Sequence, residues 1–451
     1  MIYNYNNSDK KMLLSINILV ILALAVWYFT DKLDHLPGVP GASLFPCVIS
    51  PWALTGKIMK RIQDVCRYRG SLLRIGRNKV GILNRTLALD VLSDPKMLKT
   101  PVQTSNPMIK YGLPFVSDPK LATSLRSSLF ATALHRQVLS KLVSNQMWDT
   151  CLHTLLTEIE DTDTAIENYV KRALFLLVLE LPEVESLPQM QTGPAARERM
   201  ISSIIGDNFL LKYLVKTYRK LIGMPGVNPD IDGTMHFMQS LIDRKVNIAV
   251  KMAEWGFTPE QIKCHLATIF QAGTETTAFA LKVAIINLGR HLDIQDQLYE
   301  KIATLPDRWD YTELIDACPE IMHFIYANLN YLTPIPLLRS RVCTEYIILD
   351  GKIFPEGTTF AISNDFIMQP FRRQFEMNGA REQNLSFGYG SRACPGKRLA
   401  EIELCMAISV IIKHFEVLDM DLNSNLEDEC LSFVTRYWTR DHPLKFIPRE
   451  K

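Results

Sequence analysis

The chain has 451 residues, of which 47% are hydrophobic and 22% are charged. This composition excludes a disordered tail protein, because such chains lack the apolar residues needed to bury a core. The 50 Lys and Arg residues nearly balance the 48 Asp and Glu residues, and the net charge of +2 argues against nucleic-acid binding over a broad basic surface.

An apolar run occupies Leu13–Phe29, with only two polar residues. Its 17 residues lie at the lower edge of the roughly 17–25 that span a bilayer as a helix. Two lysines precede the run and an Ala-Leu-Ala sequence lies within it, so a cleaved signal peptide is the alternative to a membrane anchor. We favour an anchor, because the strongest chemical motif in this chain needs a free thiolate. The sequence thus predicts an N-terminal segment at 1–35 and a single domain over 36–451.

The remainder of the chain is dominated by helical periodicity. Strand-like pieces are short and fall in two places, Leu72–Leu89 and Val342–Phe360, the second with an Asp350-Gly351 turn. The pattern predicts a mainly α fold with a small β-sheet region at one side.

The clearest expected helix runs from Thr258 to about His291. Thr258 is a good N-cap, Pro259 suits the first helical position, and Gln261 completes a capping box. At about 1.5 Å per residue this helix would be roughly 50 Å long, and its middle carries little charge. We therefore expect it to be buried at the centre of the domain.

A cysteine in a glycine-rich loop carries the strongest chemical signal. The segment Phe387–Gly396 reads F-G-Y-G-S-R-A-C-P-G, and an apolar helical pattern follows it at once. The helix dipole and free amides are expected to lower the pKa of Cys394 and favour its thiolate. Gly388, Gly390 and Gly396 would let backbone approach a flat ligand closely.

The other eight cysteines are scattered, and none forms a C-x-x-C pair. We therefore expect reduced thiols in a cytosol-facing protein rather than a disulfide framework or a structural zinc site.

This loop resembles the haem-binding loop of the cytochrome P-450 family, F-x-x-G-x-R-x-C-x-G, at every fixed position. The resemblance covers residues from about Leu36 to the C-terminus. It implies the cytochrome P-450 fold, with haem between the long central helix and the cysteine loop. It also implies haem b ligated by the Cys394 thiolate, which is the metal ligand. The haem-binding residues that it implies are Phe387, Gly388, Arg392, Cys394, Gly396, Arg126, Arg341 and Ala272.

The long helix contains Ala272–Thr277, which is similar to the oxygen-binding stretch of the family. Gly273 and the threonines are expected to weaken the helical ladder and open a pocket for dioxygen. Glu275 and Thr276 match the acid–alcohol pair that relays protons, and they are the implied catalytic residues.

Three arginines are candidates for binding the haem propionates: Arg392, Arg341 (with Arg339 as its alternative) and Arg126. The sequence is most similar to animal microsomal family-four members. Because the glutamate that can bond covalently to haem in family four falls at Ala272, the implied haem is non-covalent.

One family motif is not matched. The family has E-x-x-R before its Pro-x-Pro, and here Ala327 and Asn330 occupy the two charged positions. Because both the Glu and the Arg are absent, no unpaired charge is buried, but we expect the cysteine loop to be less constrained. In the family, a further arginine forms a buried network with this pair behind the cysteine loop. Arg372 or Arg373, the candidates for that arginine here, would lack a partner. Restoring the pair should then increase haem retention.

Two functions follow as hypotheses. The first is a membrane-anchored haem-thiolate monooxygenase, which inserts one oxygen atom from O2 into an apolar small molecule such as a lipid, fatty acid, steroid or xenobiotic. Its electrons would come from NADPH through a flavoprotein reductase docking near Lys397 and Arg398, and it would lie at the endoplasmic reticulum membrane with its catalytic domain facing the cytosol. The alternative is a catalytically impaired haem- or ligand-binding protein of the same fold.

Overall fold

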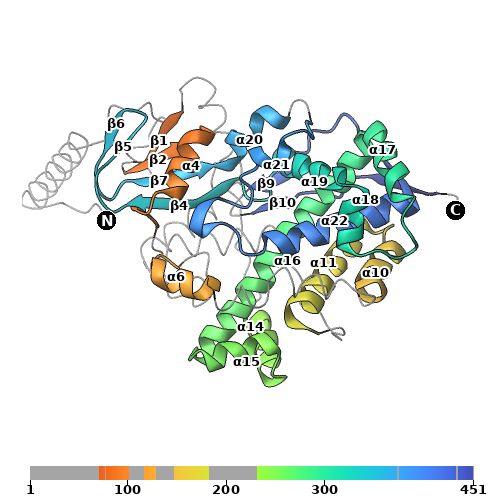
Figure 1. The fold of residues 1–451 in the computed structure, drawn as a ribbon, viewed down its shortest axis with the longest axis horizontal. Coiled ribbons are helices and arrows are strands. Elements are labelled where there is room, and N and C mark those ends of the chain that lie inside the picture. The colour runs from red at the N-terminus through yellow and green to blue at the C-terminus, as the bar shows by residue number, and fades with distance from the viewer. Residues whose placement is uncertain are drawn as a thin grey trace, which may run out of the picture.

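The computed structural model describes residues 71–76, 78–100, 116–127, 147–181, 231–372, 375–432 and 435–449. These residues form a larger helical part and a smaller part built on a sheet, which lie side by side (Figure 1). The predicted mainly α fold with a small sheet at one side is confirmed. The predicted segment 1–35, its anchor at about 13–29 and the start of the predicted domain lie outside the described residues. Within the described part, no helix is both long and apolar enough to cross a membrane.

The bounds of the helices are as follows. They are α4 (Arg85–Ser93), α6 (Pro119–Leu125), the π-helix η4 (Trp148–Leu152), α10 (His153–Thr157), α11 (Thr162–Leu179), α14 (Ile231–Asp243), α15 (Asn247–Glu254), α16 (Pro259–Arg290), α17 (Leu292–Ile302), α18 (Tyr311–Ala317), α19 (Glu320–Tyr331), α20 (Asn364–Arg372), α21 (Ala380–Gln383), the 3-10 turn η5 (Gly390–Arg392) and α22 (Lys397–His414).

In the described residues the strands form one five-stranded sheet and three two-stranded sheets. Their bounds are β1 (Leu72–Gly76), β2 (Lys79–Ile82), β3 (Met97–Lys99), β4 (Leu337–Cys343), β5 (Ile347–Leu349), β6 (Lys352–Phe354), β7 (Thr359–Ser363), β8 (Phe415–Asp419), β9 (Cys430–Ser432), β10 (Arg436–Trp438) and β11 (Leu444–Pro448). The pairs are β5 with β6, β8 with β11, and β9 with β10.

The main sheet has five strands in the order β1-β2-β7-β4-β3. Its one parallel pair joins β2 to β7, with Lys79 opposite Thr359 and Ile82 opposite Ile362. This pair joins the two regions, Leu72–Leu89 and Val342–Phe360, in which the sequence predicted strands. The expected turn at Asp350-Gly351 closes the β5–β6 hairpin, and both of its residues have positive φ.

The long helix α16 confirms the prediction from its capping residues. The Thr258 side chain accepts a hydrogen bond from the Gln261 amide, and the Gln261 side chain accepts one from the Thr258 amide. The helix is buried over most of its length and packs against α11, α14, α19 and α22 (Figure 1). It therefore forms the central support of the helical part.

Candidate active site

The cysteine loop is folded by its own backbone. The Cys394 amide donates to the Phe387 carbonyl at 2.7 Å, and the Ala393 amide donates to the Gly390 carbonyl at 3.1 Å. Gly396 is the N-cap of α22, so Cys394 lies two residues before that cap. The predicted position of the cysteine, at the entrance to a buried helix, is confirmed.

The glycines of this loop have different roles. Gly388 and Gly390 have backbone φ angles of +68° and +70°, which residues other than glycine rarely adopt. A Cβ at Gly390 would lie 2.9 Å from the Leu92 carbonyl oxygen. The absence of a side chain at Gly390 therefore allows the loop to pack closely against α4, not against a ligand. Gly388 and Gly396 line the cavity described next, as expected, whereas Gly390 is not among its lining residues.

A cavity of about 300 Å³ lies between the cysteine loop and α16. Its apolar lining includes Leu174, Val178, Ile269 and Leu338. Of the ten residues predicted for the site, nine line this cavity: Phe387, Gly388, Arg392, Cys394, Gly396, Arg126, Arg341, Ala272 and Thr276. Glu275 is not among the lining residues. Leu92, Lys99 and Ser386 also line it, and no sequence motif pointed to them.

The wall formed by α16 differs from the expectation of a weakened helix. The helix is continuous through Ala272–Thr277. The Thr276 hydroxyl donates to the Ala272 carbonyl at 2.8 Å, and the Thr274 hydroxyl donates to the Phe270 carbonyl at 2.8 Å. The prediction of a locally opened ladder is therefore wrong, because these hydroxyls bond back to their own helix and leave its backbone intact.

Glu275 and Thr276 lie on different sides of α16. Thr276 faces the cavity, whereas Glu275 is buried with 7% of its surface exposed. The Glu275 carboxylate accepts hydrogen bonds from the Tyr437 hydroxyl at 2.8 Å and from the Gln271 side chain at 2.9 Å. The structure thus does not bring the two predicted relay groups together at the cavity wall.

Three arginines bring positive charge to the cavity. Arg126, the C-cap of α6, donates to the Ala393 carbonyl, and Arg392 donates to the Val116 carbonyl. Burial lowers the pKa of both guanidinium groups. Arg341 lies on β4 and is buried. The side chain of Arg339, its alternative, lies outside the described residues.

The Cys394 sulfur is accessible from the cavity, and the surrounding protein largely shields it from bulk water. Its exposed surface belongs to the cavity wall, so the thiol is accessible to a small ligand yet enclosed by protein. Burial raises the pKa of this thiol, and the Gly396 amide, Arg126 and Lys99 only partly oppose that effect. The amide at the start of α22 lowers this pKa as expected, but the net pKa of the free thiol is raised, because desolvation outweighs the local amides and charges.

These groups fit an iron porphyrin by the chemistry of their donors. A thiol sulfur is a suitable axial donor, the apolar walls suit a flat hydrophobic ring, and the three arginines suit its two carboxylates. The fit rests on residues from four distant parts of the chain, namely α6, α16, β4 and the cysteine loop.

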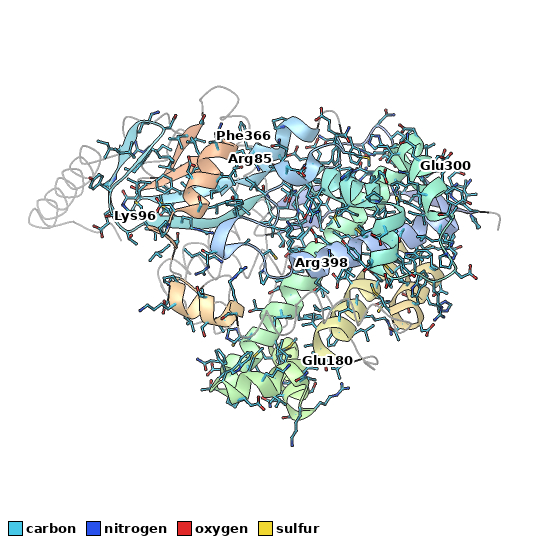
Figure 2. All side chains as sticks on the ribbon, viewed as in Figure 1. Arg85, Lys96, Glu180, Glu300, Phe366 and Arg398 are labelled. Carbon is cyan, nitrogen blue, oxygen red and sulfur yellow. The ribbon has the colours of Figure 1, made fainter. Side chains whose placement is uncertain are left out.

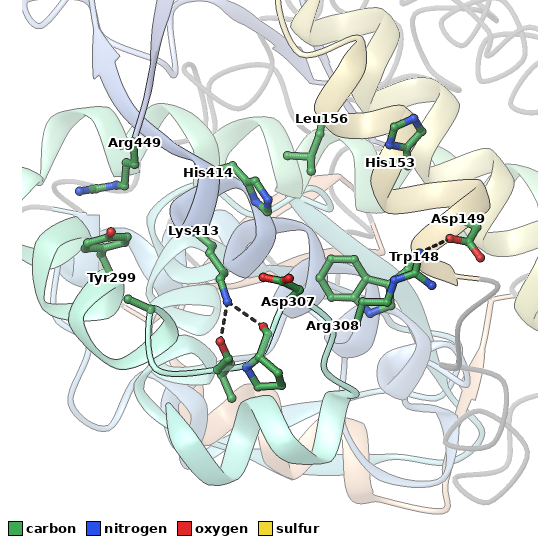
Figure 3. A pocket seen from close by; sticks show the side chains of 13 residues that line it. Trp148, Asp149, His153, Leu156, Tyr299, Asp307, Arg308, Lys413, His414 and Arg449 are labelled. Carbon is green, nitrogen blue, oxygen red and sulfur yellow. Dashed lines mark hydrogen bonds and ion pairs between the residues drawn. The ribbon is translucent and has the colours of Figure 1, made fainter. Parts of the chain in front are cut away.

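A second cavity, of about 800 Å³, lies beside the C-terminal end of α22 (Figure 3). Its cations already have partners: Lys413 donates to the Leu305 and Pro306 carbonyls, and Arg308 pairs with Asp149 at 2.5 Å. Burial also lowers the pKa of Lys413. None of the ten predicted site residues lines this cavity, so we place the chemistry at the first one.

The predicted docking face begins where α22 starts, and Arg398 is labelled near the centre of the view in Figure 2. Arg398 donates to the Tyr311 hydroxyl at 2.9 Å and lies 3.5 Å from a Glu401 carboxylate oxygen. Lys397 lies over the Phe387 ring, at 5.8 Å from its centroid. Both cations are partly buried and already engaged in contacts within the chain.

Several characterised proteins are similar to parts of this chain. Cytochrome P-450 27C1 of Danio rerio is 28% identical over 174 residues, covering 35% of this chain and 32% of that protein. The mitochondrial 25-hydroxyvitamin D-1 alpha hydroxylase of Rattus norvegicus is 29% identical over 35% of each chain. The mitochondrial sterol 26-hydroxylase of Homo sapiens is 24% identical over 42% of this chain and 36% of that protein.

The matched part thus spans about a third of the length of these relatives. A family model described as cytochrome P-450 matches residues 135–437, which is more than half of the chain and includes both the long helix and the cysteine loop. On this match, and with a cysteine loop and α16 facing each other across one cavity, the chain belongs to the cytochrome P-450 family.

Proposed function

We propose that this chain is a haem-thiolate monooxygenase that oxidises an apolar small molecule with O2. The observation that carries the proposal is the position of Cys394, whose sulfur opens into an apolar cavity that three arginines also line. Bound there, haem b would supply the oxygen-activating chemistry that side chains lack. The names of the sterol and vitamin D hydroxylases support a hydrophobic substrate class for similar proteins.

The predicted site residues then have defined roles. Cys394 would ligate the iron, and Arg126, Arg341 and Arg392 would hold the two propionates. Phe387, Gly388, Gly396 and Ala272 would surround the ring. Since position 272 is an alanine, it has no carboxylate to form a covalent link, and the haem would be held non-covalently. The Thr276 hydroxyl would deliver protons, and Glu275 would take part through a change of rotamer away from Tyr437.

The apolar run at 13–29 supports anchoring to a membrane, for which we propose the endoplasmic reticulum. In that setting the catalytic domain would face the cytosol, and an NADPH-dependent flavoprotein reductase would supply electrons. Cell fractionation tests the location. Recovery of the protein in mitochondria would overturn this location, and the names of two of the relatives above include the word mitochondrial.

The test of the proposed function is the spectrum of the reduced, CO-bound protein after haem loading. The parent should give a thiolate-type Soret band, and Cys394→Ser should lose that band. Cys343→Ser is the matched control, because Cys343 is a buried thiol that donates to the Pro355 carbonyl at 3.1 Å, a bond that a hydroxyl can also make. A parent spectrum that Cys394→Ser leaves unchanged would contradict the proposal.

A second function, a binding protein that retains the fold without turnover, is favoured by the neutral residues at positions 327 and 330. NADPH and O2 consumption with a reductase separates the two functions. Consumption coupled to product supports the monooxygenase, whereas a thiolate-type spectrum without any consumption supports the binding protein.

A further inference from the structure

The two unmatched positions of the E-x-x-R motif lie on α19 and are buried. Ala327 is 2% exposed and Asn330 is 1% exposed. A Glu–Arg pair here would place two ions in the interior, where their desolvation is costly unless they pair well. A neutral amide has a lower desolvation cost and can both donate and accept.

Asn330 uses both halves of its amide. Its Nδ2 donates to the Ala380 carbonyl at the start of α21, at 2.9 Å. Its Oδ1 accepts from Asn384 Nδ2 at 2.6 Å. Asn384 Oδ1 in turn accepts from the Ser386 amide at 3.0 Å. A chain of hydrogen bonds therefore leads from α19 to the residue that precedes Phe387.

The hydroxyl of Ser386 fixes the same segment a second time. It lies 3.2 Å from the Leu329 carbonyl, to which it donates, and 3.1 Å from the Thr333 hydroxyl. Since Phe387 follows directly and accepts the hydrogen bond of the Cys394 amide, the chain of contacts ends at the cysteine. Hydrogen bonds from α19 thus reach the start of the cysteine loop without the charged pair.

The other side of this segment is also held. Arg85 of α4 donates from Nε to the Gln383 carbonyl at 3.2 Å, immediately before Asn384 (Figure 2 marks Arg85). The segment at 383–386 thus has contacts on both sides, from α4 and from α19.

We propose that Asn330 and Asn384 are positioning residues, and that with Ser386 they form a neutral network which holds the cysteine loop in place of a Glu–Arg pair. The proposal rests on the proposed function as regards haem. The network acts through hydrogen bonds that rigidify the loop when all members are satisfied. Its effect on the loop is a property of the chain itself and is measurable without haem.

The first experiment is Asn384→Ala, with Asn328→Ala as the matched control. Asn328 lies on the same helix as Asn330 and accepts a buried hydrogen bond from Asn287 Nδ2 at 2.7 Å, toward α16 rather than toward the loop. Both variants lose one side-chain amide–amide bond, which is buried for Asn328 and partly buried for Asn384, so both should unfold at lower denaturant concentration. Only Asn384→Ala should release haem about tenfold faster and lose part of its thiolate-type band, a result that a general loss of stability would not give.

Hydrogen exchange on the haem-free protein gives the second readout. The amides of Phe387–Cys394 should exchange about tenfold faster in Asn384→Ala and at the parental rate in Asn328→Ala. Equal exchange and equal spectra in the two variants would overturn the network. A parent that binds no haem would overturn the proposed function, while the exchange rates would still decide the network.

The double variant Ala327→Glu/Asn330→Arg gives the opposite test, since the sequence alone suggests that it should increase haem retention. The network requires a decrease, because a guanidinium has no acceptor atom and could not receive the hydrogen bond from Asn384 Nδ2. A gain in haem retention, or faster loop exchange in the parent than in this variant, would refute the proposal.

Discussion

At the scale of single residues, Thr274 and Thr276 of α16 make the same kind of hydrogen bond in different surroundings. Each hydroxyl donates to the carbonyl four residues earlier at 2.8 Å. Thr276 lines the cavity, whereas Thr274 is 1% exposed and is not among the lining residues. The hydroxyl of Thr276 can therefore reach a bound small molecule by a change of rotamer, and that of Thr274 cannot.

This difference predicts that Thr276→Ala lowers product formed per NADPH by about tenfold or more, since a positioned proton donor contributes at least that factor. Electrons from NADPH that are not used for product should instead reduce O2 to hydrogen peroxide. Thr274→Ala, which removes an equivalent back-bond, should keep the parental coupling. Peroxide and product are measured in the same reductase assay. Equal coupling in both variants would contradict the role given to Thr276.

At the scale of elements, local signals predicted well and long-range ones did not. The capping box at Thr258 and Gln261 fixes where α16 begins, and the cysteine loop carries its own glycines, so both were readable from neighbouring residues. The parallel pairing of β2 with β7 joins segments about 280 residues apart in sequence, and neither strand carries a signal for the other. The network at Asn384 was missed because the motif specifies charges, whereas this chain uses amides.

A close approach of α16 to β8 gives a prediction at this scale. A Cβ on Gly289 would lie 2.4 Å from the Asp419 nitrogen and 2.8 Å from the Leu418 carbonyl carbon. Backbone atoms cannot move aside as side chains do, so Gly289→Ala should lower the free energy of unfolding by about 1–3 kcal/mol.

The matched variant is Gly273→Ala on the same helix, where the new Cβ would meet only the flexible end of Leu174, at 3.0 Å. Because alanine favours helix over glycine by about 1 kcal/mol, we expect little net loss of stability there. Denaturant unfolding of both variants measures the difference. Equal stabilities would show that the contact between α16 and β8 is not tight.

At the scale of the whole molecule, a buried ionic cluster joins α16, β8 and the C-terminal segment. His442 lies with Nε2 2.8 Å from an Asp419 carboxylate oxygen and Nδ1 3.0 Å from a Glu429 one. Arg290, at the end of α16, pairs with Asp419 at 2.5 Å, and Arg440 pairs with Glu429 at 2.8 Å. The cluster thus connects the end of the central helix to segments far later in the chain.

Because of this cluster, we expect the stability of the folded protein to depend on pH in the acidic range. Burial alone would raise the pKa of Glu429, but hydrogen bonds from Arg440 and His442 outweigh it and lower this pKa from 4.5 to about 2. A carboxyl whose pKa is lowered by folding stabilises the protein above its unfolded pKa and loses that contribution as pH falls through the folded pKa. Glu429 should therefore contribute stability at neutral pH that disappears between about pH 4.5 and pH 2.

The variant Glu429→Gln should be less stable than the parent by about 1–2 kcal/mol at pH 7, a value reduced because Arg440 is half exposed and solvent screens it. The gap should close as the pH falls toward 2, since the parental carboxyl then becomes neutral too. Glu345→Gln is the control, because it removes the same charge from a surface pair with Lys96 in which both side chains are about half exposed, and it should change stability much less than Glu429→Gln does. Denaturant midpoints over this pH range measure both. A parent and a Glu429→Gln variant that lose stability in parallel would show that the cluster does not depend on this carboxylate.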